Sequence, residues 1–545
     1  MRFIGSWLFA AISFLWIAAQ LVDPSPLVAA THPKYGGTLR VEMHAVSVSL
    51  DPREWRVGSL ESAADENLAG LVFERLVALD NYGRFQPVLA TEWSHDSLYK
   101  RWRFSIRSGV KFSDGAALSA EDIVAVLQPL LPSAEQMSAS GSAIVVQSTA
   151  PMADLLEQLA SGRYFVYRVL ASGALVGTGP FVLAEAPSSG GPSEGKDSAP
   201  RAGGAHLLFR ANEGAWSGRP FLNAVDVTLA VPPLRAMFDL QLGKADLIEL
   251  SPELVPRARQ AGLRLWTSDP VELYALRFDD AQSAAADVRL REAFSLVLDR
   301  GTMANVLLQK QAEPAAALLP QWLSGYAFLF NVDTNIERAK ELRRALPANE
   351  AAGAEPLRLR VDPPGDLAKL LGERVAVNAR QASILVQVIS RPLVRAGSST
   401  AAQTGSSSSP MPTSGVHLFA WHYSSLSPRA ELDSLFAAYN LTEPSEVNAT
   451  NTATNSATST DHEQLYARER RVLEERRVLP LVVQAETVGL GATVRDWMPA
   501  RWGEWHLADV WLETSEPAPA DSAIKGNSGT PASAQPRAAV AGAKP

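Results

Sequence analysis

The boundaries of secondary-structure elements are clearest in residues 71–127, because turn and capping residues separate short apolar patterns there. Apolar side chains at helical spacing predict a helix over residues 66–76 with one buried face. These side chains are Leu68, Leu71, Val72 and Leu76. The LDNYG run that ends at Gly83 predicts a hairpin, since glycine adopts a positive φ without strain.

The second half of this segment predicts a strand, a turn and a capped helix. Apolar and polar side chains alternate in the RWRFSIR run over residues 101–107, as in a half-buried strand. The SDG run over 113–115 predicts a turn. Ser119, followed by Glu121 and Asp122, predicts a helix start, because the hydroxyl accepts from first-turn amides and the carboxylates suit the positive helix end. None of these residues has catalytic geometry, so the segment is scaffold.

Composition narrows the class of protein. With 545 residues the chain is too long to fold around a single hydrophobic core, so we expect two or three domains. A net charge of −8 argues against nucleic acid as a partner, since phosphate binding needs a basic surface. The chain has no cysteine, which excludes disulfides, thiolate metal sites, cysteine nucleophiles and a lipid-modified cysteine anchor.

The N-terminal residues have the pattern of an export signal. Arg2 precedes an uncharged, mostly apolar run over residues 3–22, and the small residues of 28–30 offer a cleavage site before Thr31. We therefore predict a signal peptide over residues 1–30. A retained membrane anchor is the alternative, since twenty apolar residues span a bilayer. Either way, we expect the body of the protein outside the cytoplasm.

Four segments lack apolar periodicity and predict disorder, because they cannot bury enough surface to order themselves. They are the insertions 187–204, 396–415 and 443–460 and the tail 515–545. Between them, strand and helix patterns alternate, which predicts α/β layers with helices packed on mixed sheets. The strands are expected at 38–43, 207–210, 225–231, 357–361 and 385–389, and the helices at 236–242, 288–299 (capped by Asp287), 337–346 and 367–382.

Several motifs, taken in order, resemble those of the extracellular solute-binding proteins of family 5, the binding subunits of peptide/nickel-type ABC importers. Besides residues 71–127 they are YGGTL (35–39), SLDP (49–52), GTGPF (177–181), the Asn/Trp/Pro segment 212–224, GKAD (243–246), the VR…DR run over 288–300, and Trp497 and Trp511. A single match is weak, but an ordered set across residues 35–513 is specific.

The resemblance implies an α/β fold: a two-lobed periplasmic binding protein of type II with an additional third domain and mixed β-sheets flanked by helices. Lobe I would combine residues 37–64, 175–265 and 480–513; the extra domain would be 65–174, and lobe II 266–479. The chain would cross between lobes near residues 265 and 480, where a hinge belongs. Such proteins close over a ligand held between their lobes.

The ligand is harder to predict. In peptide-binding relatives, a W-x-x-D segment enters the cleft and its Asp pairs with the α-ammonium of the peptide. The matching segment here has Trp421 and Pro428 in place, but Ser424 at the Asp position. A hydroxyl cannot supply the charge of a carboxylate, so recognition of free peptide N-termini is in doubt. Glu431 and Asp433 are expected on the surface of the following helix.

Eight residues are predicted to contact the ligand by this resemblance: Ser47, Val48, Tyr274, Trp421, His422, Tyr423, Ser424 and Gln484. Trp421 is interpreted either as a platform that stacks on the ligand or as a core residue behind its strand. His422 and His417, together with His44, are either holders of a metal chelate or merely hydrogen-bonded, and no protein metal site is predicted.

We therefore expect the substrate-binding component of an ABC importer, which captures an oligopeptide or similar mid-sized organic solute and delivers it to a permease in the cytoplasmic membrane. It would be a periplasmic monomer with no cofactor and no enzyme activity. The alternative is a sensor or scaffold on the same fold. A hydrolase is disfavoured, because the HExxH and GxSxG motifs are missing and the paired acids at 121–122 and 474–475 point about 100° apart on helices.

Overall fold

The computed structural model describes residues 32–60, 62–131, 134–185, 205–279, 287–326, 330, 332–346, 356–363, 365–390, 415–441 and 457–513. The predicted signal peptide, the insertion 187–204 and the tail 515–545 lie outside the described residues, as does all but Gly415 of the insertion 396–415. The described residues from Tyr35 onward group into one compact unit. No helix among the described residues has the length and apolar character that crossing a bilayer requires.

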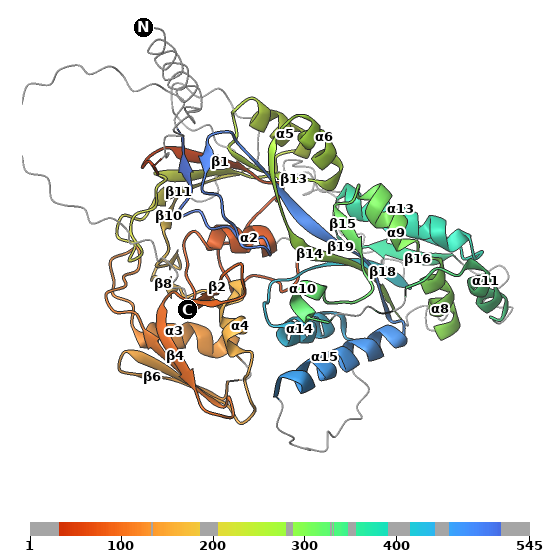
Figure 1. Ribbon diagram of the computed structural model, residues 1–545, viewed down its shortest axis with the longest axis horizontal. Coiled ribbons are helices and arrows are strands. Elements are labelled where there is room, and N and C mark those ends of the chain that lie inside the picture. The colour runs from red at the N-terminus through yellow and green to blue at the C-terminus, as the bar shows by residue number, and fades with distance from the viewer. Residues whose placement is uncertain are drawn as a thin grey trace, which may run out of the picture. The chain divides into compact units, whose positions relative to one another are not determined.

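One large mixed sheet dominates the described residues and has eleven strands there (Figure 1). Ten of them follow the order β10 (Phe181–Glu185), β11 (His206–Ala211), β12 (Ala224–Thr228), β1 (Thr38–Glu42), β13 (Leu247–Leu250), β19 (Val478–Leu490), β14 (Arg264–Phe278), β18 (Val416–His422), β16 (Leu357–Val361) and β17 (Val386–Ser390). The eleventh strand, β15 (Ala312–Pro314), pairs with β19. This mixture of parallel and antiparallel pairs with long crossovers agrees with the predicted α/β class.

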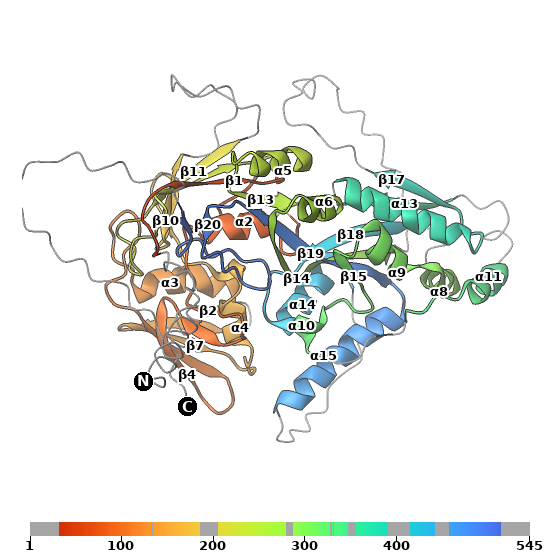
Figure 2. The same cartoon turned by 45° about the horizontal axis from the view of Figure 1, so that its top comes forward.

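Two long antiparallel strands, β14 and β19, lie side by side in the middle of this sheet (Figure 2). The early strands β1 and β13 lie on one side of the pair and the later strands β16 and β18 on the other. The pairing of β14 with β19 is irregular between Thr267 and Glu272 and again between Tyr274 and Ala275. These irregularities lie close to the predicted crossing points at residues 265 and 480, and the division into lobes itself stays a prediction.

Side chains of the sheet alternate between two faces, as the pleat requires. Tyr274, Leu276 and Phe278 join the core under helices α8 (Val288–Val297), α11 (Ile336–Arg344) and α13 (Asp366–Arg380). Leu273 and Ala275 join the opposite core, which contains α10 (Gln321–Ser324), α14 (Pro428–Tyr439) and α15 (Ala457–Glu474). The helices α5 (Pro233–Gln241) and α6 (Val255–Gln260) cover β13.

A second, four-stranded antiparallel sheet lies within the predicted extra domain. Its order is β4 (Ala90–His95), β5 (Arg101–Ile106), β7 (Ala143–Gln147) and β6 (Gln136–Ser140), and its core includes residues of α3 (Ala120–Leu127) and α4 (Leu155–Leu159). The remaining elements are α2 (Ser62–Ala69), α9 (Arg300–Thr302), η1 (Gln128–Leu130), η2 (Gly162–Tyr164), η3 (Pro252–Leu254), η4 (Met303–Leu307) and the pairs β2 (Val77–Leu79) with β3 (Phe85–Pro87), β8 (Arg168–Val169) with β9 (Leu175–Val176), and β20 (Val494–Arg495) with β21 (Trp511–Leu512).

Most local predictions are confirmed, and two are wrong. The hairpin forms between β2 and β3 with Gly83 at φ +76°, and Asp287 caps α8. The helix predicted over 66–76 instead ends at Ala69, because the backbone beyond it bonds to distant residues: the carbonyl of Leu71 accepts from Phe181 N–H at 2.9 Å. In addition, α15 begins at Ala457, so the end of the predicted insertion 443–460 is helical.

Candidate ligand-binding site

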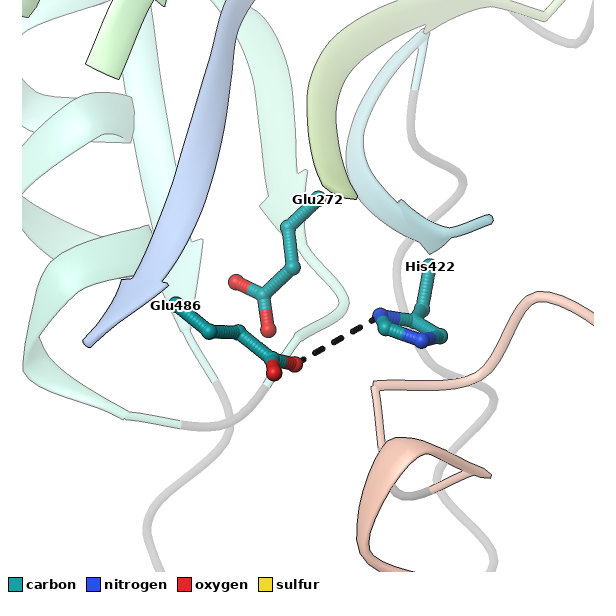
Figure 3. A group of neighbouring side chains, drawn as sticks. All are labelled: Glu272, His422 and Glu486. Carbon is teal, nitrogen blue, oxygen red and sulfur yellow. Dashed lines mark ion pairs between the residues drawn. The ribbon is translucent and has the colours of Figure 1, made fainter. Parts of the chain in front are cut away.

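Strand register brings three polar side chains into one row of the large sheet. Glu272 of β14 lies opposite His422 of β18 and opposite Gln484 of β19. Cross-strand partners point to the same face of a sheet, so the three side chains are neighbours. Glu486 follows two residues after Gln484 on the same strand. Figure 3 shows Glu272, His422 and Glu486 pointing toward one another.

The neighbouring residue Trp421 points to the opposite face and is a core residue. Its side chain is 1% exposed and packs with the apolar residues beneath α14. Gly58 covers the indole, since a Cβ built there would lie 2.2 Å from the ring. Of the two interpretations of Trp421, the core residue agrees with the structure, and its contact with a ligand stays a prediction.

Glu431 corrects a second expectation, because it is fully buried and not on the helix surface. Its carboxylate accepts from Trp421 Nε1–H and from Ser425 N–H, the latter at 2.8 Å. Burial raises the pKa of Glu431 to about 7, against the opposing effect of these hydrogen bonds. Asp433 does lie on the surface, where it pairs with Arg468 at 2.7 Å. Glu431 thus fixes the loop that follows β18 by accepting the hydrogen bond of Ser425 N–H.

A cavity opens beside this loop. His422, Tyr423, Ser424 and Leu426 line it together with residues from other parts of the chain: Ala63, Glu66, Asn67, Arg75, Ala160, Ser161, Gly162, Phe165, Glu486, Trp502, Gly503 and Glu504. Its free space totals about 480 Å³ including the opening to solvent, but only about 30 Å³ is accessible to the centre of a water molecule. This leaves room for one or two waters.

The other predicted contact residues do not line this cavity. Tyr274 and Gln484 are buried beside it, next to Glu272 in the row of strand partners. Ser47 is exposed, and Val48 packs half-buried on the core that contains β1. The structure therefore brings together His422, Tyr423 and Ser424 at the cavity, but it does not bring the predicted first-strand loop there.

The cavity wall is rich in carboxyl groups. Glu66 and Glu486 face it together with Glu504. Burial raises the pKa of Glu66 to about 8, although the nearby positive charge of Arg75 opposes this. Arg75 itself pairs with Glu504 and lies 5.1 Å from the centroid of the Phe165 ring. Glu66 has no hydrogen bond or ion pair with another described side chain at this wall.

The three histidines considered for a metal chelate do not meet. His417 Nδ1 lies 3.1 Å from Asp362 Oδ2, and His44 Nδ1 lies 3.8 Å from Glu249 Oε2. Within the part of the chain that the structure describes, only His422 belongs to a group with metal-binding geometry, together with Glu272 and Glu486. Of the two interpretations of these histidines, the separate polar partners of His44 and His417 favour the one without a joint chelate.

Sequence reasoning missed the acidic residues of the site, although the sequence holds a signal for some of them. Glu486 interrupts the nearly continuous apolar run of residues 478–490, and Glu272 stands within the apolar strand β14. Ionisable residues are seldom buried in such strands without a specific reason. Glu66 gives no comparable signal, because its helix is polar.

Residues 84–353 match the sequence model described as "Bacterial extracellular solute-binding proteins, family 5 Middle". The chain belongs to this family. Among curated relatives of this family 5 protein, the nickel-binding periplasmic protein of Escherichia coli (strain K12) is 23% identical over 279 residues, which cover 46% of this chain and 50% of that protein. The chain thus spans about half the length of that relative.

Solved structures agree with the type II periplasmic binding protein fold of family 5. NikA from Staphylococcus aureus, in complex with Ni(L-His)2, has a TM-score of 0.66 at 15% identity, covering 87% of this chain and 100% of that one. The oligopeptide-binding protein AppA from Bacillus subtilis, in complex with a nonapeptide, has a TM-score of 0.65 at 14% identity, covering 89% and 100%. At these identities the likeness establishes the fold.

Proposed function

We propose that this chain is the extracytoplasmic solute-binding component of an ABC importer. It captures an oligopeptide or similar mid-sized organic solute with a cationic group and delivers it to a membrane permease. Membership of family 5 and the binding-protein fold support the class of function. The carboxyl-lined cavity supports the class of ligand.

One observation carries the choice of ligand: Ser424 shares its cavity with Glu66. Ser424 stands where peptide-binding relatives have the carboxylate that receives the ligand ammonium. Glu66 brings a carboxyl group to the same space from a different part of the chain, and a ligand ammonium beside it would favour its ionised form. A charge-assisted hydrogen bond from an ammonium needs a carboxylate but not a particular strand to hold it. We therefore assign the ammonium contact to Glu66.

The size of the cavity requires the protein to open before a peptide enters. Only about 30 Å³ is accessible to the centre of a water molecule, which is far below the volume of a dipeptide. The loop of Tyr423 and Ser424 and the helix α2 that carries Glu66 both line the cavity, although they are far apart in sequence. Opening by movement of one wall away from the other is the motion expected of two lobes about a hinge.

The test is a thermal-shift screen of the full chain with di- to pentapeptides, in free form and with acetylated N-termini, in the presence of a metal chelator. A ligand that binds only the folded state raises the melting temperature. We expect free peptides to raise it and acetylated peptides to do so less. Glu66→Gln should weaken binding of free peptides about tenfold or more, because one charge-assisted hydrogen bond is lost.

Glu92→Gln is the matched control, since Glu92 lies exposed on β4 and away from the cavity. Equal shifts with free and acetylated peptides, or equal affinity in Glu66→Gln, would exclude the ammonium contact. No shift with any peptide would favour the sensor or scaffold alternative.

A further inference from the structure

Three strands that are far apart in sequence place nitrogen and oxygen donors around one point. Glu272, His422 and Glu486 each offer one donor atom, and these atoms all lie within 4.8 Å of one another. His422 Nδ1 and Glu486 Oε1 are 3.8 Å apart, which is too long for a hydrogen bond (Figure 3). Two ligands of one metal ion with bonds near 2.0–2.2 Å stand at about this separation.

His422 gives an independent sign that a partner belongs in this space. The residue is 5% exposed, and its Nδ1 has no hydrogen-bond partner among the described residues. A buried polar atom without a partner has lost its hydrogen bond to water without replacement, so such atoms are rare without a reason. Its ring is directed toward the two carboxyl groups (Figure 3).

A neighbouring side chain orients the Glu272 carboxylate by a hydrogen bond. The hydroxyl of Tyr274, two residues along the same strand, donates to the Glu272 carboxylate. Hydrogen bonds of this kind orient metal ligands and tune their basicity. Gln484, the strand partner of Glu272, holds a buried side-chain oxygen that has no partner among the described residues.

We propose that Glu272, His422 and Glu486 form a binding site for a divalent transition cation of the zinc type. One imidazole and two carboxylates are a donor set that Zn²⁺ accepts, and three protein ligands leave a coordination position for water or a bound solute. Because His422 and Glu486 also line the cavity, that open position faces the space of the proposed solute. This inference goes beyond the proposed function and does not rest on it.

Calorimetric titration of the chelator-treated full chain with Zn²⁺ tests the site. We expect equimolar binding, since the three donors surround one point. Glu272→Gln, His422→Gln and Glu486→Gln should each weaken Zn²⁺ binding about tenfold or more. Circular dichroism and thermal unfolding establish that each variant is folded.

Two controls separate this site from surface binding and from the solute contact. His95→Gln and Glu92→Gln change the same residue types in the four-stranded sheet and should keep wild-type affinity. Glu66→Gln should keep equimolar Zn²⁺ binding while it loses peptide affinity. Absence of equimolar binding, or equal affinity in all three ligand variants, overturns the proposal. Co²⁺ as a second probe should give a visible absorption band that His422→Gln removes, and its persistence would also overturn the proposal.

Discussion

The indole of Trp421 is held by groups of its own chain on more than one side. Gly58 packs against the ring, and Glu431 accepts the hydrogen bond of the indole N–H. We expect Trp421→Ala to lower the free energy of unfolding by about 3–5 kcal/mol, because a large cavity forms in the core. Urea unfolding measures the loss. Tyr82→Ala, at a side chain that is 85% exposed, should change the free energy by less than about 0.5 kcal/mol.

Position 58 requires glycine, because its backbone approaches Trp421 closely. Its φ is +75°, and an added Cβ would lie 2.2 Å from the ring. Gly83 is a matched control, because its φ is +76° and nothing lies within 4 Å of an added Cβ. Gly83→Ala should cost about 1–2 kcal/mol for the left-handed backbone alone. Gly58→Ala should cost about 1–3 kcal/mol more for the clash, and equal losses in urea unfolding would contradict this packing.

Individual elements follow local signals where their partners are close in sequence. Ser119 caps α3 by a reciprocal pair of bonds: its hydroxyl accepts from Asp122 N–H at 3.1 Å, and Asp122 accepts from Ser119 N–H at 3.0 Å. Ser119→Ala should lower the free energy of unfolding by about 0.5–2 kcal/mol. Ser94→Ala, at an exposed position of β4, serves as the control and should be neutral. Thermal unfolding of both variants tests the cap, which an equal melting temperature would exclude.

Local sequence signals fail to predict where α2 ends. The apolar spacing that predicts a helix to residue 76 is present, yet the helix ends at Ala69. Beyond it, Val72 accepts from Gly179 N–H at 2.9 Å, and Glu74 forms a bridge with Val166. These partners lie about a hundred residues away, so no local pattern announces them. Backbone groups take the partners that the fold offers, even where helical spacing continues.

For the whole molecule, buried acids make stability depend on pH. The pKa values of Glu66, Glu272 and Glu431 rise to about 8, 7 and 7, chiefly through burial. Each of these glutamates stabilises the fold in its protonated form. Its contribution is complete below the pKa of the unfolded state, near 4.5, and is lost as the pH rises through the pKa of the folded state. We therefore expect the free energy of unfolding of the chelator-treated chain to fall between pH 6.5 and pH 8.5.

This window excludes the opposing effect of His422, whose pKa is lowered to about 4 and whose contribution changes only below its ordinary value of 6.5. The other charged groups near the acids are Asp65, Arg75, Glu249 and Glu486. Glu431→Gln should flatten the fall in part, because one acid no longer titrates while the others remain, among them Glu469, whose pKa burial also raises to about 7. Urea unfolding at several pH values measures the slope, and a slope in Glu431→Gln as steep as that of the wild type would show that Glu431 is not the group assigned here.

The sequence by itself determined the locally encoded features: the hairpin at Gly83, the caps at Ser119 and Asp287, and the family to which the chain belongs. Turns and caps depend on residues a few positions apart, so their geometry is readable without the fold. The same local reading placed Glu431 on a helix surface, although it stands in the apolar stripe with Leu432 and Leu435.

Only the tertiary structure decided which face of the sheet Trp421 and His422 point to. Trp421 entered the core while the adjacent His422 joined Glu272 and Glu486, because successive strand residues point to opposite faces and the register of β14, β18 and β19 sets who meets whom. The cavity and its raised pKa values likewise arise from residues hundreds of positions apart. Burial and electrostatic coupling depend on distance in space, which this chain sets through its strand register.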